Sequence, residues 1–481
     1  MMQPIRVSTW NSREGGMIDR RVMLATGLAA GLAADLAATG EAAAQSLRRR
    51  VSWQVFRTST SGPSYARAVA IMRGNSNASD PNSWFYWANI HQNFCPHGVP
   101  YFLAWHRGYI LQFEQKIREL SRDPNFSLPY WNYFTDPNIP SEFTNPSPGN
   151  PLYVKRTNTN VSNALGYDFT DPYWKQLPRN WPTPMEPKVE SVPHNQVHNI
   201  IGGFMPTLQS PQDPIFWLHH ANIDRLWCAW VKAGAGRANP VPTDAYWNGT
   251  FVYGAQPQMD KRQTYSAEGL GYMYDDERLP TPRRLRAAVA PPIRAVPLAK
   301  ERLIGQVLSL GETQGGLTLD QSSFSVRVPL GDDGQNRTRL LTAQPPRGPS
   351  AAAVRPPVNV NVVLEDVAVT EAGKAGGYFY QVYVNLPAGG ALDQRRLIGT
   401  VGAFEIAGAQ HNGGGDGPHA AHGDGKVRLV LPATEALRRL SPGQLREVKV
   451  SFVRVDGPEA PTGPAITIGA FRVESTVEAP R

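Results

Sequence analysis

Cysteines, charged side chains and long apolar runs are all scarce in this chain, and each shortage excludes a class of protein. Only two cysteines, Cys95 and Cys228, occur in 481 residues, which excludes a disulfide-stapled scaffold. Apart from an Ala-rich run near the start, no apolar stretch is long enough to cross a membrane, so we expect a soluble protein without stable membrane insertion. Charged residues are 18% of the chain and hydrophobic residues 41%, which suffices for the cores of two or three domains.

The positive charge shows no pattern that points to a particular partner. The net charge is +8, but lysines and arginines are scattered, and no basic stripe is interleaved with stacking aromatic residues. We therefore expect no nucleic-acid partner.

The first 44 residues have the pattern of an export signal. The string Asp19-Arg20-Arg21-Val22-Met23-Leu24 resembles a twin-arginine motif, an apolar run covers residues 25–38, and Ala42-Ala43-Ala44 suits cleavage. We predict that residues 1–44 direct export of the folded chain to the periplasm or the outside of a bacterial cell. The alternative is an Ala-rich tail with no targeting role.

Residues 45–278 have the composition of a mainly helical domain. Aromatic residues, histidines and prolines are frequent there, and residues 65–73, 105–120 and 215–231 carry apolar residues at helical spacing. Residues 145–181 are rich in Pro, Asn and Thr without a clear period, so we predict a long surface loop.

The composition changes after residue 278. Residues 279–357 contain stretches rich in Pro and Arg and are predicted to be a linker region. Residues 358–481 alternate β-type runs with Gly, Pro and Asp, which predicts an all-β, sandwich-like C-terminal domain. The predicted strands are residues 358–364, 378–384, 427–431, 448–455 and 465–473.

Histidines are concentrated in the helical domain. Seven of the ten histidines fall into two sets: His91, His97 and His106, then His194, His198, His219 and His220. His194 and His198 are four residues apart, so on a helix both rings face one ion, although such pairs also occur by chance. Lone histidines are usually ordinary core or surface residues, but two sets among aromatic residues indicate a metal site.

The ligand chemistry favours copper over iron or zinc. Di-iron sites in helical bundles use several glutamates and a Glu-x-x-His pattern, which this sequence lacks. Structural zinc takes cysteines or a closed fourth ligand. Three imidazoles per ion without a carboxylate suit copper.

Four strings resemble the type 3 copper proteins, and among these the bacterial tyrosinases and plant-type polyphenol oxidases. They are Cys95-Pro96-His97-Gly98, Trp105-His106-Arg107, His194 through His198, and Asp213-Pro214 through Trp227. The resemblance implies a four-helix bundle with long loops around two copper ions that bind dioxygen as peroxide. It also implies the ligands, which are His91, His97 and His106 for the first copper and His194, His198 and His220 for the second.

The same resemblance implies roles for neighbours of the ligands. His219 is then expected to lie just outside the set of copper ligands, where it helps to direct a proton. Phe216 is expected to pack under the coppers. Asp224 and Arg225 tie the second ligand helix to its surroundings. In some fungal relatives a cysteine at the position of Cys95 is bonded to the ligand ring, which suggests a Cys95–His97 thioether.

Two other states of Cys95 stay open. One is a free buried thiol, and the other is a disulfide with Cys228.

The implied activity is that of a tyrosinase, which hydroxylates monophenols to o-diphenols and oxidises o-diphenols to o-quinones. In the family a glutamate and an asparagine at the positions of Glu190 and Asn195 are proposed to hold a water as base. A solvated loop charge and hydrogen bonding at a helix N-terminus are the alternatives for these two residues.

The entrance to the expected site is predicted to be open. The small Thr207 stands where some relatives carry a blocking residue, and Met205 lies near the mouth. Asn199 either touches substrate, as the same position does in relatives, or is an ordinary polar residue of its helix. A catechol oxidase without hydroxylase activity, a reversible oxygen carrier and a copper store remain alternatives. The export signal and the open Thr207 position argue against the carrier.

The C-terminal domain is expected to regulate the enzyme. Tyr272-Met273-Tyr274 resembles the tyrosine pair that closes the catalytic domain of plant-type polyphenol oxidases, whose next domain covers the copper entrance. We expect this domain to act as an intramolecular inhibitor, released by cleavage within residues 279–357, with phenolic small molecules and dioxygen as the partners of the opened site. His411, His419 and His422 lie among glycines, and a flexible loop is preferred there over a copper-delivery loop.

Overall fold

The structure is a computed structural model that describes residues 47–166, 168–254, 258–281, 291–342, 358–387, 392–412, 425–438 and 446–477. Residues Arg48–Arg481 form one compact unit. The predicted export signal, His419 and His422 lie outside the described residues. Among the helices that are described, none has the length and apolarity needed to cross a membrane.

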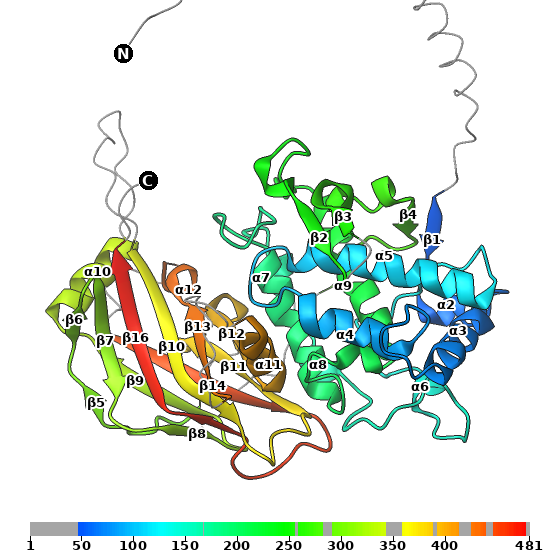
Figure 1. The fold of residues 1–481 in the computed structure, drawn as a ribbon. Coiled ribbons are helices and arrows are strands. Elements are labelled where there is room, and N and C mark those ends of the chain that lie inside the picture. Colours follow the sequence, from blue (N-terminus) through cyan, green and yellow to red (C-terminus); the bar gives the residue numbers. More distant parts are fainter. Residues whose placement is uncertain are drawn as a thin grey trace, which may run out of the picture. The chain divides into compact units, whose positions relative to one another are not determined.

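Residues 47–281, the helical half, are built around four helices (Figure 1). These are α4 (Trp84–Phe94), α5 (Phe102–Ser121), α8 (Gln196–Ile201) and α9 (Ile215–Lys232). Helix α3 (Gly62–Gly74) packs on α5, and α5 also packs on α9. The helical periodicity of residues 65–73, 105–120 and 215–231 is confirmed by α3, α5 and α9. The strict four-helix bundle stays a prediction.

The start and the end of the helical half are joined by a parallel pair of strands. Strand β1 (Arg48–Arg50) pairs with β4 (Tyr272–Tyr274). Arg50 is fully buried, and its guanidinium carbon lies 3.7 Å from the ring centroid of Tyr272. Since a buried cation must be compensated, Arg50 also pairs with Glu114 at 2.8 Å and with Asp224 at 3.5 Å.

The prediction of a surface loop over residues 145–181 is partly wrong. The segment has little regular structure, but Val161, Leu165, Phe169, Trp174 and Leu177 are buried in the same hydrophobic core as the helices. The apolar residues of this segment are irregularly spaced, because buried side chains in a loop follow no fixed repeat. Their burial therefore cannot be predicted from periodicity.

Residues 291–477, the β-rich half, contain two sheets (Figure 1). One has the strand order β5-β7-β16-β10-β15-β8, with β13 and β6 paired onto β10 and β7, and the other has the order β12-β11-β14-β9. Strands β10 (Val358–Val369), β11 (Tyr378–Val384), β13 (Val427–Pro432) and β14 (Glu447–Asp456) confirm four predicted strands. The fifth, residues 465–473, contains two strands, β15 (Ile466–Ile468) and β16 (Ala470–Val477).

The β-rich half is not purely β. It also contains the helices α10 (Asp332–Thr342), α11 (Ala403–Asn412) and α12 (Thr434–Arg438), which the sequence argument missed. Strand β12 (Leu397–Val401) leads directly into α11.

The prediction of a linker over residues 279–357 is wrong for its centre. That region contains β5 (Leu298–Ala299), β6 (Arg302–Ile304), β7 (Val307–Thr313), β8 (Leu317–Leu319), β9 (Phe324–Pro329) and α10. Strand β9 pairs with the distant β14, and β7 pairs with β16. Pairing with strands that are far away in the sequence stabilises strands whose own sequence is only weakly typical of β-structure. The linker prediction was wrong because it was based on the flanking stretches rich in Pro and Arg.

Candidate functional site

Six of the seven clustered histidines lie on helices α4, α5, α8 and α9 or in the turns that precede α5 and α8. His91 is on α4 and His106 on α5, while His97 lies in the turn between them. His194 lies in the π-helical turn η3 (Glu190–Asn195), His198 on α8 and His220 on α9.

The six rings converge into two adjoining groups. In the first, ring centroids are 5.1 Å apart for His91 and His97 and 5.0 Å for His97 and His106. In the second, they are 4.5 Å apart for His194 and His198 and 4.9 Å for His194 and His220. The groups touch through His106 and His220, whose centroids are 4.5 Å apart.

The outward ring nitrogens fix the orientation of most of these imidazoles. The Nδ1 atoms of His91, His106 and His198 lie 2.7 Å from the carbonyl oxygens of Leu208, Phe102 and Met205. The Nδ1 of His194 lies 2.8 Å from Oδ1 of Asn195. Each acceptor holds the Nδ1 proton, which leaves Nε2 with a free lone pair toward the centre of the site.

The inward nitrogens are the ones without ordinary partners. Within the described part of the chain, the buried Nε2 atoms of His91, His97 and His106 have no hydrogen-bond partner. The Nε2 of His220 lies 3.3 Å from that of His194 and 3.4 Å from that of His198. Burying these nitrogens without hydrogen-bond partners costs free energy. Their lone pairs are, however, suited to binding metal ions.

The imidazoles are held neutral, as metal ligands must be. Burial lowers the pKa of His91 to about 3 and holds the pKa of His97, His106, His194 and His198 well below the usual value.

Among the residues that the structure describes, three groups have possible ligand atoms within 4.8 Å of one another: His194, His198, His219 and His220; His91, Cys95 and His97; and His91, His106 and His220. All are neutral nitrogen or sulfur donors and no carboxylate joins them, a donor set that fits copper. His219 has its ring centroid 5.0 Å from that of His198, and neither of its ring nitrogens has a partner among the described residues.

Phe216 and Cys95 lie directly against the ligand rings. The Phe216 ring centroid is 4.1 Å from that of His220 and 5.0 Å from that of His91. Both cysteines are free, so the alternative of a disulfide is wrong, and the Cys95 Sγ atom lies 3.1 Å from Nδ1 of His97. Burial raises the pKa of the Cys95 thiol.

Glu190 is not the solvated loop charge that was one alternative. It is buried, with Oε1 accepting a hydrogen bond of 2.7 Å from the Gly98 amide and Oε2 paired with Arg179. Glu186, one helical turn earlier, accepts a bond of 3.2 Å from the Leu103 amide at the start of α5. These two carboxylates thus bind the backbone just after His97 and in the first turn of α5.

Asn195 is not the capping residue of α8 that was its alternative. No side-chain cap forms there, because Oδ1 of Asn195 faces His194. Its side chain is also hydrogen-bonded to Glu405 of the β-rich half.

The predicted entrance residues take different places. Thr207 is exposed and donates its hydroxyl to the Phe204 carbonyl, while Met205 is buried and binds His198 through its carbonyl. Asn199 is fully buried against the β-rich half.

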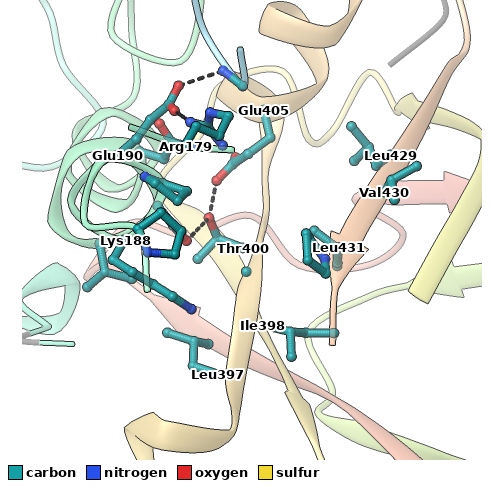
Figure 2. Close-up of a pocket in the computed structure, with 18 of the residues that line it drawn as sticks. Arg179, Lys188, Glu190, Leu397, Ile398, Thr400, Glu405, Leu429, Val430 and Leu431 are labelled. Atoms are coloured by element: carbon teal, nitrogen blue, oxygen red, sulfur yellow. Dashed lines mark hydrogen bonds and ion pairs between the residues drawn. The ribbon is translucent and has the colours of Figure 1, made fainter. Parts of the chain in front are cut away.

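A cavity of about 370 Å³ opens beside the site (Figure 2). Its lining includes the polar residues His97, Glu190, Asn195 and Glu405 and the apolar residues Leu397, Ile398, Leu429 and Leu431. Thr207, Met205 and Asn199 do not line it.

Helix α11 supplies residues that the sequence argument missed. Phe404 stacks on His198, Gly408 lies against the Cβ atom of His97, and Asn412 donates to the His97 carbonyl. No signal in the ten-residue helix marks it as part of a site, because its partners are more than 200 positions away in the chain.

Asp224 and Arg225 connect α9 to its surroundings, as predicted from the resemblance. Asp224 accepts bonds of 2.6 Å from the Tyr272 hydroxyl and 2.7 Å from the Tyr274 hydroxyl, and it pairs with Arg107 at 2.6 Å. Arg225 donates to Asn222 and to the carbonyl of Asp276.

Comparison with known proteins agrees with this site. The family described as the common central domain of tyrosinase matches residues 81–184 and 145–233. A tyrosinase from Hahella sp. is 30% identical over 309 residues, which is 48% of this chain and 63% of that protein. A chloroplastic polyphenol oxidase from Malus domestica is 25% identical over 292 residues, 47% of this chain and 49% of that protein. The matched part therefore spans about half to two thirds of these relatives' length.

The fold is also found among solved structures. Latent apple tyrosinase matches 89% of this chain and 97% of its own with a TM-score of 0.51 at 21% identity. A latent aurone synthase matches 90% of each chain, also with a TM-score of 0.51, at 18% identity. A helical core followed by a β-rich domain is thus a shared fold.

The six histidines all lie within the residues that match the tyrosinase central domain, and they fit the copper pair of that domain. By this domain and by these relatives, the chain is similar to the tyrosinases and polyphenol oxidases. The cofactor of this family is a pair of copper ions, and the six converging imidazoles fit it.

Proposed function

We propose that this chain is a copper-dependent phenol oxidase, and within that class a tyrosinase that hydroxylates monophenols to o-diphenols and oxidises o-diphenols to o-quinones. The observation that carries the proposal is the convergence of six neutral imidazoles, with buried Nε2 atoms facing inward and no carboxylate among them. His91, His97 and His106 would hold one copper ion, and His194, His198 and His220 the other. When bound, the copper pair supplies dioxygen binding and electron transfer.

The protein's own task is to orient the phenol and move its proton. Glu190 and Asn195 line the cavity next to His97, which supports a role for them in holding the water that takes the phenolic proton. The ring centroid of His219 lies 5.3 Å from that of His194 and 5.0 Å from that of His198, and His219 is our candidate for a group that passes this proton on. Phe216 supports the rings from below.

One observation favours the alternative of a catechol oxidase. Both oxygens of Glu190 are engaged, one by the Gly98 amide and the other by Arg179, so Glu190 has little capacity left for a water. An o-diphenol is more acidic and does not require hydroxylation, so its oxidation depends less on Glu190.

The β-rich half is proposed to shield the site. The relatives of similar fold include enzymes described as latent, and here Phe404 stacks on His198 while residues of both halves line the cavity. Cleavage within residues 279–357 would release the shield. Residues 1–44 are proposed to direct export.

Oxygen uptake tests the activity. The copper-loaded protein, with its halves separated by proteolysis, is given a para-alkyl phenol or the matching catechol. Uptake with both supports a tyrosinase, and uptake with the catechol alone supports a catechol oxidase. Oxygen that is bound and released without being consumed would overturn the proposal in favour of a carrier.

A further inference from the structure

Arg179 is the cation that faces Glu190 in the cavity beside the histidine site. Its Nη2 atom donates to Oε2 of Glu190, and both side chains line the cavity (Figure 2). The other oxygen of Glu190 accepts the bond of 2.7 Å from the Gly98 amide. The backbone thus holds one oxygen of the carboxylate and a side chain holds the other. Of the two bonds, only the one from Arg179 can break through a side-chain rotation alone.

The ion pair of Arg179 and Glu190 is largely shielded from solvent. The Glu190 side chain is 4% exposed and the Arg179 side chain 20% exposed. A hydrogen bond between two charged groups is stronger than one between a carboxylate and a neutral donor such as water. A water that enters the cavity must therefore compete with the guanidinium for Oε2 of Glu190.

The loop that carries Arg179 is joined to the helical turn that leads to Glu190. The Met185 amide donates a bond of 2.7 Å to the Gln176 carbonyl, and the next amide, of Glu186, donates one of 3.2 Å to the Leu177 carbonyl. Helix α7 (Glu186–Val189) follows directly and is continued by η3, which begins with Glu190. Both partners of the ion pair thus belong to one short segment of the helical half, and the β-rich half contributes neither of them.

Glu186 is a second carboxyl near Arg179, but it is poorly suited to take over the cation. Burial raises the pKa of Glu186 to about 7, against the opposing effect of the Arg179 charge. At lower pH this carboxyl is neutral, so Glu190 balances the charge of Arg179. Among the described residues, Nε of Arg179 has no hydrogen-bond partner, and the bond to Glu190 is the contact that fixes the guanidinium.

We propose that Arg179 is a positioning residue that sets the specificity of the enzyme, because it occupies the oxygen of Glu190 that would otherwise hold the water for the phenolic proton. This inference rests on the proposed phenol oxidase function and names a determinant of its substrate class. Monophenol hydroxylation requires that water, whereas oxidation of an o-diphenol depends on it less. Arg179 therefore lowers the ratio of the first rate to the second.

Oxygen uptake with a para-alkyl phenol and with its catechol measures this ratio. The copper-loaded chain is used before and after proteolysis, and the ratio is compared because closure of the site lowers both rates together. Arg179→Met and Arg179→Ala are both expected to raise the ratio about tenfold, since a hydrogen bond to a charged group is worth about this factor. Arg179→Lys is expected to keep the wild-type ratio, because the contact uses a single terminal nitrogen that an ammonium group can replace.

Lys188→Gln is the matched control. Lys188 lines the same cavity, but its ammonium nitrogen lies 4.5 Å from the centroid of the Trp174 ring. This variant removes the same charge, and its ratio is expected to stay at the wild-type value. An unchanged ratio in Arg179→Met and Arg179→Ala, or an equal rise in Lys188→Gln, would overturn the proposal. Absence of uptake with the catechol in every variant, before and after proteolysis, would instead reject the proposed function itself.

Hydrogen exchange at the Gly98 amide of the metal-free full chain separates this role from a merely structural one. The amide donates to Oε1 of Glu190, so its protection reports whether Glu190 stays in place. Glu190→Ala is expected to speed this exchange about tenfold. Arg179→Met is expected to leave it unchanged, because Glu190 keeps its bond to the backbone. Acceleration in Arg179→Met as large as in Glu190→Ala would show that Arg179 only holds Glu190 in position, and would overturn the proposal.

Discussion

The ring of Phe404 stacks on the imidazole of His198, with ring centroids 4.0 Å apart and planes inclined by 22°. A phenol ring approaching the second group of imidazoles needs this space. We predict that Phe404→Ala raises catechol-dependent oxygen uptake by the full chain at least tenfold, because truncating a buried aromatic ring removes several kcal/mol of packing from the closed form. Phe452→Ala, in the core of the β-rich half, is the control for mere destabilisation. Equal gains in both variants would mean that loosening of the fold, and not the ring on His198, opens the site.

The sequence predicted the histidine site well because its signals are local. His194 and His198 stand at helical spacing, and the strings around His106 and His220 precede or open amphipathic helices, so neighbouring residues sufficed to place them. The strands β10, β11, β13 and β14 were predictable for the same reason, since each carries a continuous β-type run.

Contacts between the two halves could not be predicted in this way. Phe404 and Glu405 meet Asn199 across more than 200 positions, and the short helix α11 has no periodic signal of its own. Glu190 was expected to be a solvated charge or a water-holding group, and only the fold shows that Arg179 and the Gly98 amide use its oxygens. Such pairings depend on tertiary packing, which a local pattern does not encode.

Cys95 is placed for a covalent bond to His97. The Sγ atom lies 3.1 Å from Nδ1 of His97, next to the ring carbon that a thioether would use. We predict that the mature copper-loaded chain has an intact mass lower than the sequence mass by two hydrogens, and that the deficit survives reduction. Cys95→Ser should restore the full mass, while Cys228→Ser should keep the deficit. A wild-type mass without any deficit would leave Cys95 as a free buried thiol.

Asn195 has two tasks that different substitutions separate. Asn195→Asp keeps an oxygen for the Nδ1 proton of His194 but loses the amide donor, whereas Asn195→Gly loses both. If the amide helps to hold the water that accepts the phenolic proton, Asn195→Gly lowers monophenol hydroxylation about a hundredfold and diphenol oxidation much less. The two rates are measured on the cleaved enzyme as oxygen uptake with a phenol and with its catechol. Parallel loss of both rates in Asn195→Gly, restored by Asn195→Asp, would show that the residue acts only through His194.

Glu186 makes the stability of the chain depend on pH. Burial raises its pKa from an ordinary 4.5 to about 7, because the charged form is poorly solvated there. The folded chain thus holds this proton more tightly than the unfolded chain. The stability contributed by the neutral carboxyl is present below pH 4.5 and is lost as the pH rises toward 7.

Glu186→Gln removes this titration and keeps an oxygen for the Leu103 amide. We predict that the wild-type chain loses up to about 1.4 kcal/mol per pH unit from this group across that window, and that the variant loses correspondingly less. Urea unfolding midpoints of both chains at pH 5 and pH 7 measure the difference. Identical pH slopes would show that Glu186 is ionised in the folded chain throughout.

Metal analysis after copper loading shows whether the six histidines hold two copper ions in this chain. We predict two copper ions per wild-type chain, one per chain in His106→Asn and one in His220→Asn, because His106 and His220 are proposed as ligands of different copper ions. His219→Asn should keep both ions. A single copper ion in the wild type, or loss of an ion from His219→Asn but not from His220→Asn, would contradict the assignment.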